Sequence, residues 1–137
     1  MTDTIFYKII QGDAPCYKVY EDDDFLVMLD IFPAHLGHCV IMPKIPARDI
    51  FDLNEKSAAR LWDVTKHIAN MVKTATGCDG INILQNSGAA AGQTVFYFHV
   101  HVIPRFSGMD DGLDFKGAAK QYEKQDFEMM LNKLVSL

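Results

Sequence analysis

His99 and His101 are the side chains whose type and spacing most suggest chemistry in this 137-residue chain. They fall in a run of β-branched and aromatic residues, Thr94–Ile103, that is closed by Pro104 and predicts a strand. Because alternate strand residues share a face, the two imidazoles should lie roughly 7 Å apart on one face. The opposite face would be wholly apolar and would lie against a core: Phe96, Phe98, Val100 and Val102.

The residues alone leave three interpretations of this histidine pair open. Neutral imidazoles can be structural and satisfied by backbone groups, although two of them beside a polar turn make this the weakest interpretation. A His-x-His pair can supply two ligands to a metal ion, with His38 or Asp30 as a third, but no spacing in the sequence requires it. The pair can also act on a phosphate ester, one imidazole as nucleophile or base and the other as a donor.

The turn before the strand favours the phosphate interpretation. Residues 87–92 read Ser-Gly-Ala-Ala-Ala-Gly, and successive backbone amides in such a turn can converge on an anion. Gln93 and Thr94 follow directly and add side-chain donors. We therefore expect a phosphate-binding loop beside His99.

The elements expected around this strand follow the order α-β-β-β-α-β-β-α. Since this order has no regular βαβ alternation, it predicts an α+β fold with an antiparallel sheet. The long helix should bury a stripe of side chains that includes Trp62 and Ile68. Helices are expected from Thr2 or Asp3 to Ile10, from Asn54 to Thr76 and from Asp126 to Leu137; strands at Tyr17–Tyr20, Phe25–Ile31, His38–Met42, Gly80–Gln85 and within Gly92–Ile103; and loops at the acidic turn Glu21–Asp24 and at Ser107–Gly117.

The totals exclude several classes of protein. The length suits one domain spanning residues 1–137. A net charge of −5 argues against nucleic-acid binding, which needs a basic face. No signal peptide and no apolar run long enough for a membrane span is visible. The three isolated cysteines are typical of free thiols in the cytoplasm: Cys16, Cys39 and Cys78.

Residues Gly92–Arg105 resemble the signature of the histidine triad (HIT) family, which is His-φ-His-φ-His-φ-φ (φ apolar) after a Gly-Gln-Ser/Thr-Val step. The resemblance extends over about residues 3–106. It includes Asp3–Ile10, which is similar to the first helix of the nucleotide-binding branch, and the segments Leu29–Pro33, Gly37–Lys44 and Ile83–Asn86. It implies a five-stranded antiparallel sheet with a long central helix, short terminal helices and a homodimer.

The chain departs from the family signature at the first triad position, where Tyr97 replaces histidine. In the family this histidine supports the nucleophile, so its loss predicts retained but altered activity, with a rate below that of a Tyr97→His variant. Tyrosine can still donate a hydrogen bond, but it titrates near 10 rather than near 6.5. The chain also lacks the amino-terminal Cys-x-x-Cys of some bacterial relatives, because Tyr7 occupies the place of the second cysteine. Their structural zinc is therefore not expected, and no metal ligand is assigned.

The resemblance implies a site for a purine nucleotide such as AMP. His99 matches the family's nucleophile, His101 the histidine that contacts the phosphate, and His38 a histidine near the triad. Asp30 would hydrogen-bond the ribose hydroxyls. The resemblance also implies an apolar slot for the base, formed by Ile5, Phe6, Ile9 and Ile31. The ribose and the α-phosphate would be held by Asn86, Gln93 and Thr94.

The implied reaction is cleavage at the α-phosphate of a purine nucleoside phosphoramidate through a nucleotidyl-His99 intermediate that water then hydrolyses. For this, the second ring nitrogen of His99 should donate to a backbone carbonyl. No cofactor is required, although a divalent metal ion could accompany a polyphosphate substrate. Two alternatives stay open: a dinucleoside polyphosphate hydrolase, and a nucleotide-binding or sensor protein whose catalysis is weakened by Tyr97.

Overall fold

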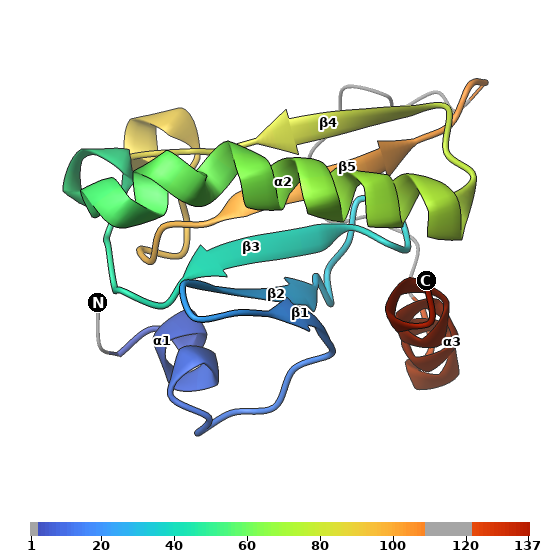
Figure 1. Cartoon of the computed structure of the whole chain (residues 1–137), viewed down its shortest axis with the longest axis horizontal. Helices are drawn as coiled ribbons and strands as arrows, with labels where there is room; N and C mark the ends of the chain where they lie inside the picture. Colours follow the sequence, from blue (N-terminus) through green and yellow to red (C-terminus); the bar gives the residue numbers. More distant parts are fainter. Residues whose placement is uncertain (1–2, 109–121) are drawn as a thin grey trace.

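The computed structural model describes residues 3–108 and 122–137. Thr2 and residues 109–117, for which a cap and a loop were expected, lie outside these ranges. Five strands of the described chain form one antiparallel sheet in the order β1-β2-β3-β5-β4 (Figure 1). The strands are β1 (Lys18–Glu21), β2 (Phe25–Leu29), β3 (Cys39–Pro43), β4 (Gly80–Leu84) and β5 (Val100–Arg105). The predicted α+β class and antiparallel sheet are confirmed.

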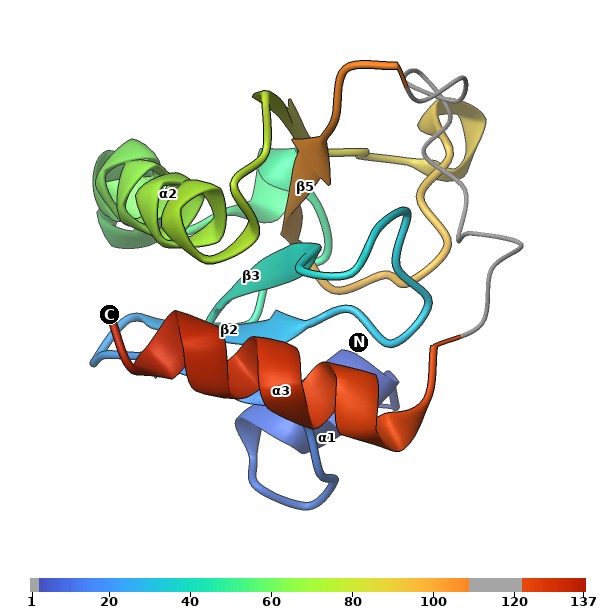
Figure 2. The same cartoon turned by 90° about the vertical axis from the view of Figure 1, so that its right-hand side faces the viewer.

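The helices cover the two faces of the sheet unequally (Figure 2). Helices α2 (Glu55–Thr76) and α3 (Lys124–Val135) pack on one face, and α1 (Ile5–Ile10) packs on the other. Short 3-10 turns lie at Ile50–Asp52 and Ala89–Ala91. No helix in the described ranges is both long and apolar enough to cross a bilayer.

The caps of these helices agree with the sequence in one case and differ in another. Asn54 caps α2 by accepting from the amide of Lys56, and the helix ends at Thr76, as predicted. Gly77 follows in the left-handed conformation. The predicted cap of α1 is wrong, since Thr4 accepts the amide of Tyr7 at 3.0 Å.

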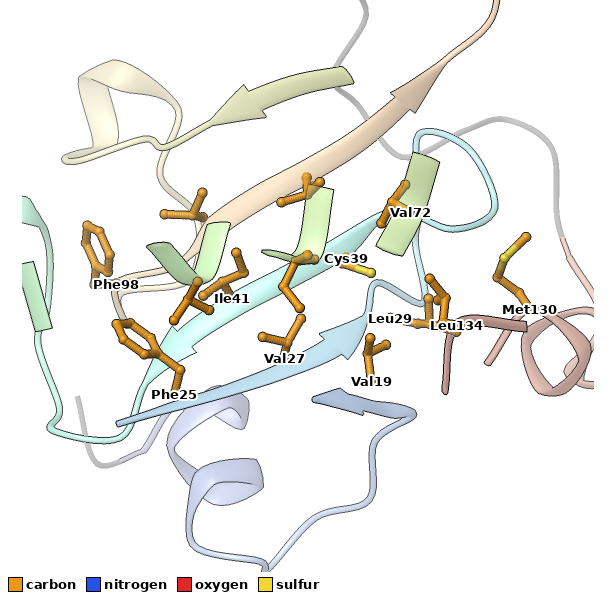
Figure 3. Close-up of a cluster of buried hydrophobic side chains, with 14 of the residues drawn as sticks. Val19, Phe25, Val27, Leu29, Cys39, Ile41, Val72, Phe98, Met130 and Leu134 are labelled. Carbon is orange, nitrogen blue, oxygen red and sulfur yellow. The ribbon is translucent and has the colours of Figure 1, made fainter. Parts of the chain in front are cut away.

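The main core fills the space between the sheet and helices α2 and α3 (Figure 3). Alternate residues of each strand point into it, as Phe25, Val27 and Leu29 do from β2. Helix α2 contributes Ile68, which is fully buried, whereas Trp62 is 71% exposed and does not belong to the predicted stripe. Burial of this apolar surface is the main source of the free energy of folding.

The strand around the histidines is shorter at one end than the sequence predicts and longer at the other. It begins at Val100 rather than Thr94, and it continues through Pro104 to Arg105. The paired residues of β3 and β5 stop at Ile41 and Val100, although β3 itself continues to Pro43. The amide of Phe98 donates instead to the carbonyl of Ala47 at 2.7 Å.

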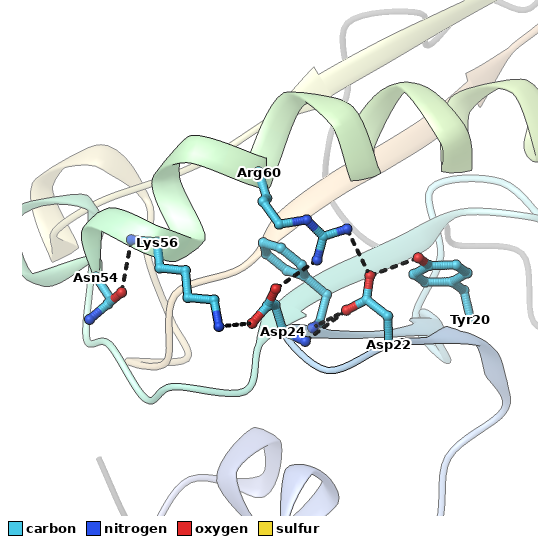
Figure 4. A network of polar contacts seen from close by, with 7 residues as sticks. Tyr20, Asp22, Asp24, Asn54, Lys56 and Arg60 are labelled. Atoms are coloured by element: carbon cyan, nitrogen blue, oxygen red, sulfur yellow. Dashed lines mark hydrogen bonds and ion pairs between the residues drawn. The ribbon is translucent and has the colours of Figure 1, made fainter.

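The sequence suggested that the acidic turn between β1 and β2 is a freely solvated loop. The structure instead shows that it is held by hydrogen bonds. Asp22 and Asp24 accept hydrogen bonds from the guanidinium of Arg60 on α2, at 3.1 and 2.8 Å (Figure 4). Tyr20 donates to Asp22 at 2.7 Å, and Lys56 lies 3.4 Å from Asp24. This network ties the β1–β2 hairpin to the start of α2.

Candidate active site

A cavity of about 500 Å³ opens on the sheet face that carries α1. Its walls are mostly apolar, and the polar groups converge at one end, as in sites for small ligands. The cavity brings together eight of the residues expected in the site: Ile5, Phe6, Ile9, Asp30, Ile31, His38, His99 and His101.

His99 is held in one tautomer by the backbone. Its Nδ1 lies 2.6 Å from the carbonyl oxygen of Tyr97. A carbonyl can only accept, so Nδ1 carries the ring proton and Nε2 keeps a free lone pair. The sequence predicted such a contact for a nucleophilic histidine, and this contact is present.

His38 and His101 form a hydrogen-bonded pair with an equally fixed proton arrangement. The amide of Ala34 donates to Nδ1 of His38 at 3.1 Å, so the proton of His38 sits on Nε2. His38 Nε2 then donates to His101 Nδ1 at 2.8 Å, which places the proton of His101 on its Nε2. The neutral site thus combines a lone pair on His99 with an N–H on His101.

The spacing of the rings differs from the estimate made for an ideal strand. The ring centroids of His99 and His101 lie 4.9 Å apart, with the planes at 78°. The rings come closer than about 7 Å because His99 precedes the first ladder residue of β5, and its ring turns to reach the Tyr97 carbonyl. One phosphoryl group can therefore contact both imidazoles.

Burial keeps these imidazoles neutral. Desolvation is the largest cause that lowers the pKa of His99 below 6.5, and the Tyr97 carbonyl and Asp30 only partly oppose it. Desolvation is also the largest cause that lowers the pKa of His38 and of His101. Arg105 and then His99 add to the effect on His38, and His38 and His99 add to the effect on His101. The neutral forms of His99 and His101 are thus dominant near pH 7.

Asp30 lies at the polar end of the cavity, where β2 ends. One carboxylate oxygen, Oδ1, accepts the amide of Phe32 at 2.8 Å. The other, Oδ2, lies 3.5 Å from His38 Nε2 and 3.9 Å from His101 Nδ1. Asp30 thus connects the apolar part of the cavity to the histidines.

Asp30, His38 and His101 could also hold a metal ion. Their potential ligand atoms all lie within 4.8 Å of one another, and His99 is not in this group. This trio differs from both the His99–His101 ligand pair considered from the sequence and the expectation of no metal ligand. An ion on His38 Nε2 would require its proton to move to Nδ1, which already faces the Ala34 amide.

Tyr97 contacts His99 through its main chain. Its side chain is fully buried beneath α1, and its hydroxyl donates to the carbonyl of Pro43. Burial raises the pKa of this phenol, with a smaller contribution from Tyr7. The tyrosine side chain is therefore a core group here, whereas its carbonyl orients His99.

Three residues predicted to contact the nucleotide are not among those that line the cavity. The amide of Gln93 is already engaged, because Nε2 donates to the carbonyls of Arg48 and Val95, at 2.8 and 3.1 Å, and Oε1 accepts the amide of Gly88. The side chain of Gln93 thus holds the loop in shape, and the expected contact of Gln93 with the nucleotide stays a prediction. The other two, Asn86 and Thr94, remain predictions.

Phe32 and Cys16 line the cavity but were not expected in the site. Phe32 is 76% exposed at the mouth, directly after Ile31, and this adjacency was the one available signal. Cys16 lies in the irregular segment between α1 and β1, whose path the sequence does not specify. Neither residue belongs to a periodic pattern that could have indicated its position.

The HIT domain family matches residues 11–108 of the chain. Adenylylsulfatase HINT3 of Arabidopsis thaliana is 43% identical over 103 residues, which are 75% of this chain and 52% of that protein. A Hit-like protein of Bartonella henselae involved in cell-cycle regulation, solved with an unknown ligand, is 31% identical and superposes with a TM-score of 0.88 over 99% of this chain and 96% of its own.

A Zn-bound histidine triad family protein of Mycobacterium smegmatis is 34% identical to this chain. It superposes with a TM-score of 0.81 over 98% of this chain and 95% of its own. The family match covers most of the chain, including His99 and strand β5, which carries His101. The chain therefore belongs to the HIT family.

Proposed function

We propose that this protein is a hydrolase that cleaves the α-phosphate bond of a purine nucleoside phosphoramidate through a nucleotidyl-His99 intermediate. The observation that carries the proposal is the proton arrangement of the site. His99 donates its Nδ1 proton to the Tyr97 carbonyl, which leaves the lone pair of its Nε2 free. The neighbouring His101 carries its proton on Nε2. Such an arrangement suits a nucleophile next to a hydrogen-bond donor.

The reaction takes two displacements. His99 Nε2 forms a bond to the α-phosphorus while the bond from phosphorus to the leaving nitrogen breaks, and the amine leaves with a proton taken from water. Water then attacks phosphorus, the bond from Nε2 to phosphorus breaks, and a nucleoside monophosphate is released. His101 donates to the phosphoryl oxygens throughout. No cofactor enters these steps, and a divalent ion would serve only to shield a polyphosphate leaving group.

The cavity supports a nucleoside as the group that is transferred. Ile5, Ile9 and Ile31 offer an apolar slot suited to a purine, and Asp30 can accept from the ribose hydroxyls. Asn86 and Thr94, which flank the loop near Gly88–Gly92, would hold the ribose and phosphate. An apolar slot without polar groups that read the base edge would discriminate weakly between bases.

Adenylyl sulfate is a second candidate substrate, because the Arabidopsis relative carries the name adenylylsulfatase. It presents the same α-phosphorus to His99, as a dinucleoside polyphosphate also would. A sensor protein with weakened catalysis would use the same slot and would bind AMP without turning over substrate. The three cysteines are unpaired, which suits a reducing cytoplasm as the place of action.

A homodimer is also part of the proposal. Strand β4 is an edge of the described sheet, and the exposed apolar side chains of Ile50 and Trp62 lie beside Ile83 of this strand. A second copy would cover this surface and pair the open strand edge. Analytical ultracentrifugation should give twice the chain mass, and Trp62→Glu should shift it toward the monomer; a monomer at micromolar concentration would contradict this part.

The decisive experiment is intact-mass spectrometry after brief mixing with an adenosine phosphoramidate. The quench must avoid acid because the phosphorus–nitrogen bond of the adduct is acid-labile, and released AMP is assayed in the same sample. Both adduct and AMP should disappear in His99→Ala, which removes the nucleophile. AMP binding without adduct or turnover, also with adenylyl sulfate, would favour the sensor and overturn the proposed reaction.

A further inference from the structure

The imidazole of His99 is held from three directions. The Tyr97 carbonyl fixes Nδ1 at 2.6 Å. The ring of His101 meets it edge-on from β5, and the ring of Phe6 meets it edge-on with centroids 4.8 Å apart and planes at 86°. Phe6 is the contact that comes from another element, since Tyr97 and His101 belong to the same stretch of chain.

Phe6 stands on α1, which has six residues. A helix of this length is not stable by itself in water, so its position depends on packing. Ile9 is buried against a small cluster on this face of the sheet, made of Leu26, Met28, Val40, Met42 and Tyr97. The place of Phe6 relative to His99 is therefore set by how α1 docks on the sheet.

The same helix forms a wall of the slot proposed for the base. Ile5, Phe6 and Ile9 all line the cavity, and Phe6 also touches His99. A base in the slot would press on α1, and α1 bears directly on the nucleophile. The side chain of Phe6 thus contacts both the slot proposed for the base and the imidazole of His99.

We propose that Phe6 is a positioning residue that couples occupation of the base slot to the orientation of His99. The inference rests on the proposed function. The base of the substrate stabilises α1 in its docked position, and the Phe6 ring then holds the imidazole with Nε2 toward the phosphorus. Binding energy from a remote part of the substrate is in this way used at the reacting centre.

The test compares Phe6→Leu with Phe6→Tyr and Ile31→Ala, using adenosine phosphoramidate and ribose 5′-phosphoramidate as substrates. In the wild type, the base should raise kcat and not only lower KM. Phe6→Leu should reduce kcat for the adenosine substrate about tenfold, because small misplacement of a reacting group is costly, and should bring the two kcat values together. Phe6→Tyr keeps the ring and should restore most of the difference.

Ile31→Ala is the matched control, since Ile31 lines the same slot and is 55% exposed. It should lose activity through a raised KM. If Phe6→Leu behaves like this control, with KM raised and the kcat ratio of the two substrates unchanged, Phe6 is only a wall of the slot and the inference is wrong.

A measurement without substrate separates this inference from the proposed reaction. Crystal structures without substrate should show the imidazole of His99 turned away from the Tyr97 carbonyl in Phe6→Leu and held at that carbonyl in Phe6→Tyr. An unchanged position of the His99 ring in Phe6→Leu would overturn the positioning role even where His99→Ala abolishes turnover, whereas turnover that persists in His99→Ala would overturn the reaction itself.

Discussion

The two faces of the sheet use the same strands for different purposes. On one face, Val100 and Val102 of β5 pack with α2 and α3 in a continuous aliphatic and aromatic core. On the other face, His101 of the same strand and the adjoining His99 lie in a cavity beneath a six-residue helix. One strand thus provides side chains to both the core and the site.

The difference teaches where the stability of the site comes from. The face with the cavity has only a small buried cluster, and it leaves about 500 Å³ unfilled. Filling such a space with side chains would add stability, but it would leave no room for a ligand. The core face holds the sheet rigid, so the site face can keep a cavity and buried imidazoles.

The largest expected effect concerns the cavity face and is the dependence of kcat/KM on pH. Protonation of His99 removes its lone pair, so kcat/KM should fall about tenfold per pH unit below the pKa of His99, which lies below 6.5. The rate should be level above that pKa. Stopped assays at each pH, with circular dichroism to verify folding, check this. A fall in rate that starts well above pH 6.5 would show that another group controls the reaction.

The next effect concerns only the core face and is a loss of folding stability. Ile68→Ala removes a fully buried side chain and should reduce the free energy of unfolding by about 3–4 kcal/mol. Because Ile68 lies on α2, across the sheet from the cavity, AMP affinity of the folded protein should stay within about twofold. Urea unfolding and calorimetric titration measure both quantities. A large loss of AMP affinity would contradict the separation of the two faces.

A smaller effect tests the network that fastens the hairpin to α2. Burial acts to raise the pKa of Asp22, but hydrogen bonds from Tyr20, Arg60 and two backbone amides outweigh it and hold this pKa well below its usual range. The stabilisation is present above the unfolded pKa near 4 and is lost as the pH falls below it.

Asp22→Asn should therefore cost about 1–2 kcal/mol at pH 7. The difference from wild type should shrink as the pH is lowered from about 4 toward 2. Urea unfolding at several pH values measures it, and Asp13→Asn, an exposed change away from this network, is the control. A cost that does not depend on pH would mean that charge contributes little to the contact.

The smallest effect concerns the triad position that departs from the family signature. Tyr97→Phe removes the hydroxyl that donates to Pro43 but keeps the carbonyl that accepts from His99. Stability should fall by about 1 kcal/mol, and kcat should change less than about threefold. Thermal unfolding and steady-state kinetics check this, with Tyr97→His assayed beside it. A tenfold loss of kcat in Tyr97→Phe would mean that the hydroxyl acts on the nucleophile.

Local patterns predicted the elements well. Asn54 and Gly77 marked the ends of α2 because capping depends on neighbouring residues. The stretch 94–99 was assigned to a strand on propensity, but a strand also requires pairing, and the pairing of β3 with β5 stops at Ile41 and Val100. Trp62 of α2 lies near Ile83 of β4 but is exposed. The helical spacing of apolar residues alone could not show that it lies outside the core.

The members of the site could be named from the family signature, but most of their contacts could not. Asp30, His38 and His99 meet in one cavity as expected. Two further contacts depend on chain paths that no local pattern encodes: the Ala34 amide on His38 and the ring of Phe6 on His99. The contacts of Gln93 within the loop could not be predicted, because a glutamine side chain suits a phosphate donor as well as it suits a group that holds a loop in shape.

The proton arrangement of the three imidazoles starts from two main-chain groups, the amide of Ala34 and the carbonyl of Tyr97. Alanine scanning would therefore miss both, because changing a side chain leaves these atoms in place. Replacing the peptide bond at Ala34 with an ester, by semisynthesis, would delete the amide donor and free the tautomer of His38. The side chain at position 34 can thus change, whereas its backbone amide is needed to fix the tautomer of His38.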